Sequence, residues 1–169
     1  MKENYTATNY PSKNIQTETY EDGDIFVTKH YYDTKDAYVK ELIYEQDGTK
    51  EVKHFTTSGV ATKLEHFVGD KREGLETKYI VSKADGSIKS TKMYESGKLH
   101  GDNITYNSHR KIIKHEVYAL GKLIVRYTRE NSDDNDISEI EIIDKDNLDS
   151  LAKADFEKLQ VSLENIKKD

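Results

Sequence analysis

The stretch Tyr94-Glu-Ser-Gly-Lys-Leu-His-Gly101 decides the fold, because its aromatic spacing recurs along most of the chain. Aromatic residues follow one another at intervals of 11 to 15 residues, at Tyr20, Tyr32, Tyr44, Phe55, Phe67, Tyr79, Tyr94, Tyr106 and Tyr118. A step of about 12 residues with one aromatic and one turn leaves room for a strand of about six to eight residues and a tight connection. Two such steps predict a β-hairpin, which is the full repeat.

Glycines that follow the aromatic residues within a few positions support this prediction, since short hairpin loops need residues with a positive φ angle. We expect structural turn roles for Gly48, Gly97, Gly101 and Gly121. The strand-like segments alternate imperfectly, and neither face of the predicted sheet is strongly apolar, which favours a partly covered sheet over a sandwich. The sequence therefore predicts a mainly β protein, a single-layer antiparallel meander of hairpin repeats.

The chain divides into three segments. Residues 1–19 are polar and predict an N-terminal arm, residues 20–128 hold the hairpin repeats, and residues 129–169 predict an acidic hinge, a final strand and a C-terminal helix. Apolar residues in 147–168 follow spacings of three and four, the period of one helical face. This amphipathic helix either covers part of the sheet or serves self-association or partner docking, through Phe156, Leu159, Leu163 and Ile166.

The run Tyr94-x-x-Gly97-Lys-Leu-His-Gly101 resembles the signature of MORN repeats, with weaker copies at Tyr44, Phe67 and Tyr118. The resemblance covers roughly residues 20–127. The repeats of this chain are more similar to the degenerate bacterial MORN repeats than to the eukaryotic pattern, because the chain has no Trp and lacks the second glycine after Tyr44 and Tyr118. The resemblance implies a single-layer hairpin sheet. Some bacterial repeats of this kind carry an antitoxin label, which makes an antitoxin one expectation.

Charge is unevenly distributed along the chain. The net charge is −5 over residues 1–70, +6 over residues 71–128 and −7 over residues 129–169. One interpretation of this pattern is ordinary solvated surface. The other is a bipolar surface that pairs with a charged partner, with electrostatics setting the rate and register of association. The predicted basic contacts are Lys78, Lys89, Lys92, Arg110, Lys111 and Lys114.

Catalytic and cofactor signatures are missing from the sequence. With no Cys there is neither a disulfide nor a thiolate zinc site. No glycine-rich loop precedes a helix, and neither His109 nor His115 has a Ser or carboxylate at the spacing of a catalytic triad. We therefore expect no enzymatic activity, no cofactor and no metal.

These observations favour a non-enzymatic protein-binding module, namely an inhibitor, antitoxin or immunity-type protein that occludes a larger partner protein. The alternative is a phage-encoded inhibitor of a nucleic-acid-guided nuclease, which would bind a nucleoprotein; direct nucleic-acid binding alone is less favoured, because the acidic ends repel a phosphate backbone. A phosphoinositide or membrane-surface role is opposed by the net charge of −6. No apolar run approaches the roughly 20 residues of a membrane span. Residues 1–19 show no secretory signal, so we expect a cytoplasmic location, in a bacterial or phage-infected host cell.

Overall fold

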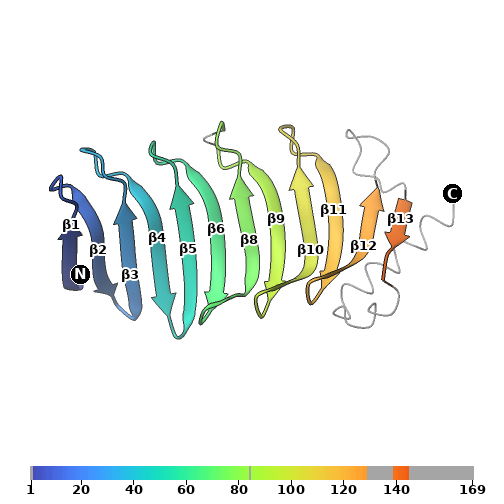
Figure 1. Cartoon of the computed structure of the whole chain (residues 1–169), viewed down its shortest axis with the longest axis horizontal. Coiled ribbons are helices and arrows are strands. Elements are labelled where there is room, and N and C mark those ends of the chain that lie inside the picture. Colours follow the sequence, from blue (N-terminus) through green and yellow to red (C-terminus); the bar gives the residue numbers. More distant parts are fainter. Residues whose placement is uncertain (1, 84, 129–138, 145–169) are drawn as a thin grey trace. The chain divides into compact units, whose positions relative to one another are not determined.

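The computed structural model describes residues 2–83, 85–128 and 139–144. These residues confirm the mainly β prediction, because they form one open antiparallel sheet of thirteen strands. Apart from the two-residue strand β7, which pairs with β6, the strands follow one another across the sheet in the order of the chain. Figure 1 shows this succession from β1 to β13. The architecture is therefore the predicted meander of hairpins.

The chain forms two compact units, Met1–Arg72 with Lys78–Ser87 (unit 1) and Glu73–Thr77 with Ile88–Asp169 (unit 2). Unit 1 contains β1 (Glu3–Asn9), β2 (Ile15–Asp22), β3 (Ile25–Tyr31), β4 (Val39–Gln46), β5 (Thr49–Phe55), β6 (Ala61–Val68) and β7 (Lys71–Arg72). Unit 2 contains β9 (Ile88–Glu95), β10 (Lys98–Tyr106), β11 (Ile112–Ala119), β12 (Lys122–Thr128) and β13 (Glu139–Ile142), while β8 (Gly74–Tyr79) contributes residues to both units.

One set of connections consists of two-residue turns. Between β4 and β5, Asp47 and Gly48 have φ angles of 51° and 76°. Two positive φ angles define the turn that matches the twist of a hairpin, and glycine adopts the second without steric cost. Ser96 and Gly97, with φ angles of 50° and 84°, and Leu120 and Gly121, with 47° and 93°, repeat this pattern. Three of the four predicted turn glycines therefore have the expected role.

The opposite ends of the hairpins carry longer loops. In three of them the first loop residue donates its N–H to the carbonyl four residues on, from Tyr10 to Asn14, Thr56 to Val60 and Asn107 to Lys111. The fourth predicted turn glycine, Gly101, lies in neither kind of connection. It sits inside β10 at an irregularity in the pairing with β9, where its φ is +84° and an added Cβ would lie 3.6 Å from Met93.

The two ends of the described chain are β-strands. The segment 1–19, predicted as a polar arm, holds β1 and the first part of β2, and these two strands pair antiparallel. The predicted final strand is present as β13, which pairs with β12. The predicted helix over residues 147–168 lies outside the described residues.

The register of unit 1 shows that its regularly spaced aromatic residues do not all lie on one face of the sheet. Tyr20 and Tyr44 stand on one face, because Tyr20 pairs with Val27 and Val27 pairs with Tyr44. This row continues through Glu51 to His66 rather than to Phe67. Since neighbouring residues of a strand point to opposite faces, Phe67 lies on the other face. The aromatic row is therefore broken within unit 1.

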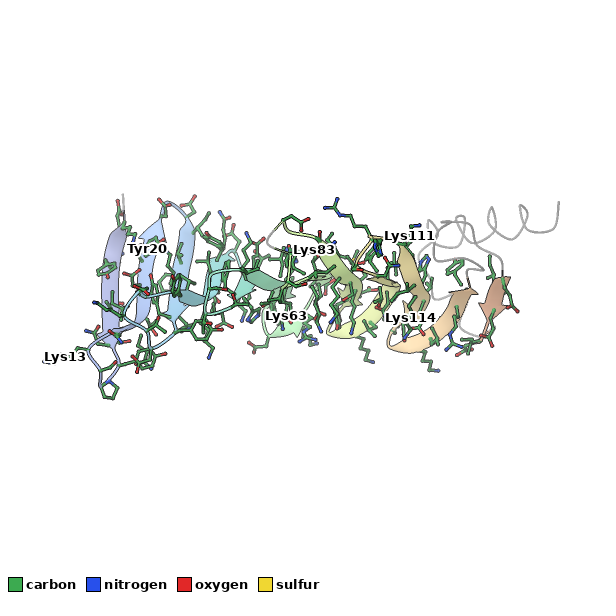
Figure 2. The ribbon with its side chains drawn as sticks, turned by 90° about the horizontal axis from the view of Figure 1, so that it is seen from above. Lys13, Tyr20, Lys63, Lys83, Lys111 and Lys114 are labelled. Atoms are coloured by element: carbon green, nitrogen blue, oxygen red, sulfur yellow. The ribbon has the colours of Figure 1, made fainter. Side chains whose placement is uncertain are left out.

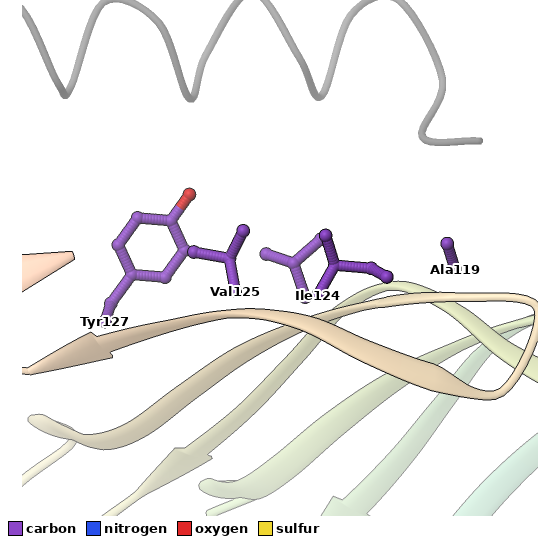
Figure 3. Packing of buried hydrophobic residues seen from close by; sticks show 5 residues of the cluster. Ala119, Ile124, Val125 and Tyr127 are labelled. Atoms are coloured by element: carbon purple, nitrogen blue, oxygen red, sulfur yellow. The ribbon is translucent and has the colours of Figure 1, made fainter. Parts of the chain in front are cut away.

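Apolar burial is modest in each unit. Unit 1 buries Tyr20, Val27, Tyr31 and Val52, whereas unit 2 buries a tighter cluster of Val117, Ala119, Ile124, Val125 and Tyr127, with Ile140 against it. Figure 3 shows the side chains of Ala119, Ile124, Val125 and Tyr127 on the same side of the ribbon. Among the described residues there is no helix long and apolar enough to cross a membrane.

Candidate partner-binding surface

A buried glutamate organises one face of unit 2. The Glu116 carboxylate is 3% exposed, yet its Oε2 atom lies 3.0 Å from Lys114 Nζ. The Tyr118 hydroxyl donates a hydrogen bond of 2.9 Å to the same oxygen, and Arg126 Nε lies 3.6 Å from Oε1. Arg126 also reaches out to Glu141, at 3.2 Å. The buried carboxylate thus fixes two cationic side chains that remain about half exposed.

Strand pairing explains why these groups meet. The register places Lys92, Asn103, Glu116, Arg126 and Glu141 side by side in one row from β9 to β13. Lys114 and Tyr118 lie two residues to either side of Glu116, so the alternation of a strand puts them on the same face. We call this face the Glu116 face. It presents a charged surface whose central anion is hidden and whose cations are held in place.

The ionisation of Glu116 follows from these neighbours. Burial alone would raise the pKa of its carboxyl, because the charged form loses hydration. The hydrogen bonds from Lys114 and Tyr118 and the charges of Lys114 and Arg126 outweigh burial, so the pKa lies below its ordinary value. The carboxylate is therefore ionised at neutral pH.

Unit 1 repeats the arrangement around Glu65 on β6. This carboxylate is also buried, and it contacts Lys63 Nζ at 2.6 Å and Arg72 Nη2 at 2.8 Å. His54 Nε2 lies 2.9 Å from Oε2, the same oxygen that Lys63 contacts, whereas Arg72 contacts Oε1. Burial again opposes ionisation, but the hydrogen bonds from Lys63 and His54 and the charges of Lys63 and Arg72 lower the pKa of Glu65. In both units, the shortest ion pair of the buried glutamate is with the lysine two residues before it.

The structure divides the predicted basic contacts among several places. Lys92 and Lys114 lie on the Glu116 face, whereas Lys89, an odd number of residues from Lys92 on β9, projects from the opposite face. Arg110 and Lys111 belong to the loop between β10 and β11, and Lys78 belongs to unit 1. Figure 2 shows charged side chains on both sides of the ribbon, with Lys63, Lys111 and Lys114 labelled. The six residues therefore do not form one patch.

Sequence reasoning missed Arg126 and the role of Glu116. The motif Lys114-x-Glu116-x-Tyr118 carried a signal, since residues at i, i+2 and i+4 of a strand share a face. Arg126 had no such signal, because its contact with Glu116 depends on the pairing of β11 with β12.

Histidines on the strands are paired with carboxylates across neighbouring strands. In unit 1, His54 Nδ1 lies 3.3 Å from Glu41, and His30 Nε2 lies 3.8 Å from the other oxygen of Glu41. In unit 2, His115 Nε2 lies 2.8 Å from Asp102, and its ring stacks on Tyr127. Within the described part of the chain no group of His, Asp and Glu is placed to hold a metal ion. These pairs connect strands, and His30 Nδ1 also lies 3.1 Å from the Thr17 hydroxyl.

A hollow of about 360 Å³ lies at the turns of unit 1, between the β4–β5 and β6–β7 connections. Its lining is polar and largely acidic, with Asp24, Glu45, Asp47 and Asp70 beside Lys50. Small-molecule sites are usually walled by apolar and aromatic side chains, which this hollow lacks.

Comparison with known proteins identifies no relative. No family model matches the chain, and no curated protein matches it. One similar solved structure is a mutant of S. aureus TarM in complex with fondaparinux, α-GlcNAc-glycerol and UDP, at 14% identity and a TM-score of 0.40. The match covers 72% of this chain and 21% of that chain, so the matched part spans about a fifth of that chain's length. A likeness this weak carries no argument about fold or function.

Proposed function

We propose that this protein is a non-enzymatic binding module that occludes a larger partner protein, as an inhibitor, antitoxin or immunity-type protein does. In this proposal the chain is a degenerate MORN-type repeat protein, and it acts in the cytoplasm of a bacterial or phage-infected cell. It turns over no substrate and uses no cofactor.

The observation that carries the proposal is the Glu116 face. Lys114 and Arg126 are 55% and 46% exposed, yet both are tied to a carboxylate that water barely reaches. A charged side chain held in position loses less conformational freedom on binding than a freely rotating one, which favours association. Tyr118 adds an aromatic ring beside them, and Tyr and Arg are enriched among the residues that dominate interface energies.

The sign of the charge favours an acidic partner surface. The +6 net charge of residues 71–128 lies between two negative segments, and the exposed cations of the Glu116 face belong to this positive region. Such a pattern speeds association with a negatively charged surface and disfavours positively charged ones.

A second candidate function rests on the same cations. They would equally meet phosphates, as in an inhibitor of a nucleic-acid-guided nuclease that contacts both protein and nucleic acid. A phosphoinositide or membrane-surface role is a weaker candidate, because the net charge of −6 opposes an anionic membrane.

Two single variants on one strand test the proposal. Lys92→Gln removes a charge from the Glu116 face, and Lys89→Gln removes the same charge three residues earlier, from the opposite face. The full-length proteins would be immobilised and used to capture partners from a lysate of the source organism, with mass spectrometry for identification. We expect a captured protein whose affinity falls with Lys92→Gln and further with Lys92→Gln and Lys114→Gln together, and is unchanged by Lys89→Gln.

Fluorescence anisotropy with a labelled DNA duplex and a labelled single strand separates the two candidates. The protein-binding proposal expects no binding of either probe at about 150 mM salt, the ionic strength at which long-range attraction between surface charges is screened beyond about 8 Å. Tight, salt-dependent binding of a probe would favour the nucleoprotein candidate. Equal loss of partner affinity with Lys89→Gln and Lys92→Gln would exclude the Glu116 face as the contact surface.

A further inference from the structure

The second face of unit 2 is more deeply buried than an open sheet allows. Ile124 and Val125 are 0% exposed, and Val117 and Ala119 are nearly so. The described strands of unit 2 belong to one sheet, with no second layer among the residues that the structure describes. Since an uncovered sheet face is open to water, these side chains require a cover.

A bulge concentrates the apolar groups on this face. Val117 pairs with Val125 and Tyr118 with Leu123, so Ile124 is an extra residue in β12. An extra residue breaks the strict alternation of a strand and re-aims a side chain. Ile124 consequently stands beside Val125 on the same side, as Figure 3 shows. We call Val117, Ala119, Ile124, Val125 and Tyr127 the apolar cluster.

The cover is confined to β11 and β12. Met93 on β9 lies on the same face as the cluster and is 39% exposed. A cover that spanned the whole face would bury it. The occupant must therefore be narrow and must lie over the end of unit 2 where β12 is.

The path of the chain brings a suitable occupant to this place. After β13, the N–H groups of Ile143 and Asp144 both donate to the Ile124 carbonyl, at 2.7 and 3.3 Å. The chain therefore leaves the described region beside Ile124, one of the two fully buried residues of the apolar cluster. Residues 145–169 follow, and they contain the three- and four-residue apolar spacing of an amphipathic helix. A helix about 10 Å in diameter matches a cover two strands wide, since strands lie about 4.8 Å apart.

We infer that residues 147–168 of the same chain dock on the apolar cluster through Phe156, Leu159, Leu163 and Ile166. This assigns the helical segment to intramolecular packing, and self-association and partner capture become outcomes of the test. It also leaves the Glu116 face as the open side of β11 and β12. The inference does not depend on the proposed function.

The absence of cysteine from the chain allows a clean test with one introduced thiol. Ala119→Cys places a small reporter in the apolar cluster of the full-length protein, and its rate of reaction with DTNB measures exposure. A second reporter, Val27→Cys, sits at a buried position of unit 1 and detects general unfolding. Each reporter is combined with Phe156→Asp, with Leu159→Asp, or with Asn165→Asp. Asn165 lies half a helical turn around from Phe156 at 100° per residue, so Asn165→Asp adds the same charge on the opposite side.

We expect the thiol at position 119 to react slowly in the parent protein and with Asn165→Asp. With Phe156→Asp or Leu159→Asp its rate should rise roughly tenfold or more, because local opening governs access to a buried group. The thiol at position 27 should remain slow throughout. Unchanged protection at position 119 in both variants would overturn the inference, as would a parallel rise at position 27. Protection that weakens on dilution would also overturn it, because the cover would then be a second copy of the chain.

Discussion

The hydroxyl of Tyr32 donates a hydrogen bond to the backbone carbonyl of Phe55, 2.8 Å away, and so ties one long loop to the strand end of the next hairpin. Tyr10 makes the same contact with the carbonyl of Tyr31, at 2.7 Å. Both tyrosines are the first residue after a strand, and both acceptors are the last residue of a strand. At the next equivalent position the chain has Thr56, whose hydroxyl bonds within its own loop instead. The inter-hairpin tyrosine contact is thus seen at Tyr10 and Tyr32 but not at Thr56.

The first prediction concerns this contact. Tyr32→Phe keeps the ring and removes only the hydroxyl, and we expect a loss of about 1 kcal/mol in the free energy of unfolding, the usual net value of one such hydrogen bond. Urea denaturation followed by circular dichroism measures it. Tyr38→Phe, at an exposed ring of the same loop, is the matched control and should change stability little. Equal effects of the two substitutions would show that the Tyr32 hydroxyl has no special role.

The second prediction concerns the turn Ser96–Gly97. Gly97→Val should cost roughly 1–3 kcal/mol, because a β-branched residue tolerates a positive φ poorly. Ser96→Gly, at the neighbouring residue with a φ of 50°, should instead leave stability unchanged or raise it slightly. Thermal unfolding of the two variants gives the comparison. If both variants melt at the parent temperature, the turn geometry does not limit stability.

The third prediction concerns acid sensitivity. Glu65 and Glu116 have pKa values lowered in the folded protein, so their contribution to stability is complete above the ordinary value of 4.5 and is lost as the pH falls through the folded-state pKa. Glu65→Gln and Glu116→Gln should each be less stable than the parent at pH 7, by about 1–3 kcal/mol. Below pH 4 the difference should shrink, because the parent carboxyls are then becoming protonated.

Denaturant unfolding at pH 7, 5, 4 and 3 checks this dependence. Glu45→Gln, at an exposed carboxylate of β4, is the control and should follow the parent at each pH. A constant offset between Glu116→Gln and the parent across this range would mean that ionisation of Glu116 does not stabilise the fold.

Much of the fold could be predicted because the spacing of aromatics and glycines records local geometry. The turns at Gly48, Gly97 and Gly121 follow from the positive φ angles that two-residue hairpin loops require. The face of each residue could not be predicted in the same way. Tyr44 lies three residues before the first residue of its turn, Asp47, whereas Tyr94 lies two residues before Ser96. A difference of one residue moves the aromatic side chain to the opposite face of the sheet. The face is set by the register of strand pairing, which the interval between aromatic residues does not reveal.

The candidate site was predicted in part for the same reason. Lys114 was identified from the charge of its segment, and the two-residue spacing to Glu116 was visible in the sequence. Lys89 and Lys92 were grouped by charge alone, but a separation of three residues on a strand places them on opposite faces. Arg126 reaches Glu116 only through the register of β11 and β12. The charge of each sequence segment therefore predicted which region is basic, whereas strand pairing determines which of its residues share the Glu116 face.

The strand order has a consequence for how the chain reaches its native state. Nearly every strand pairs with those that precede and follow it in the sequence, so each hairpin closes only a short loop. Contacts between residues near in sequence are formed quickly, even though all-β proteins are usually slow because their pairings are distant. Hairpins at the N-terminal end can pair before the last ones have been synthesised. A duplicated or deleted hairpin of the repeat would leave the remaining pairings intact, which gives this architecture a simple route to change its length in evolution.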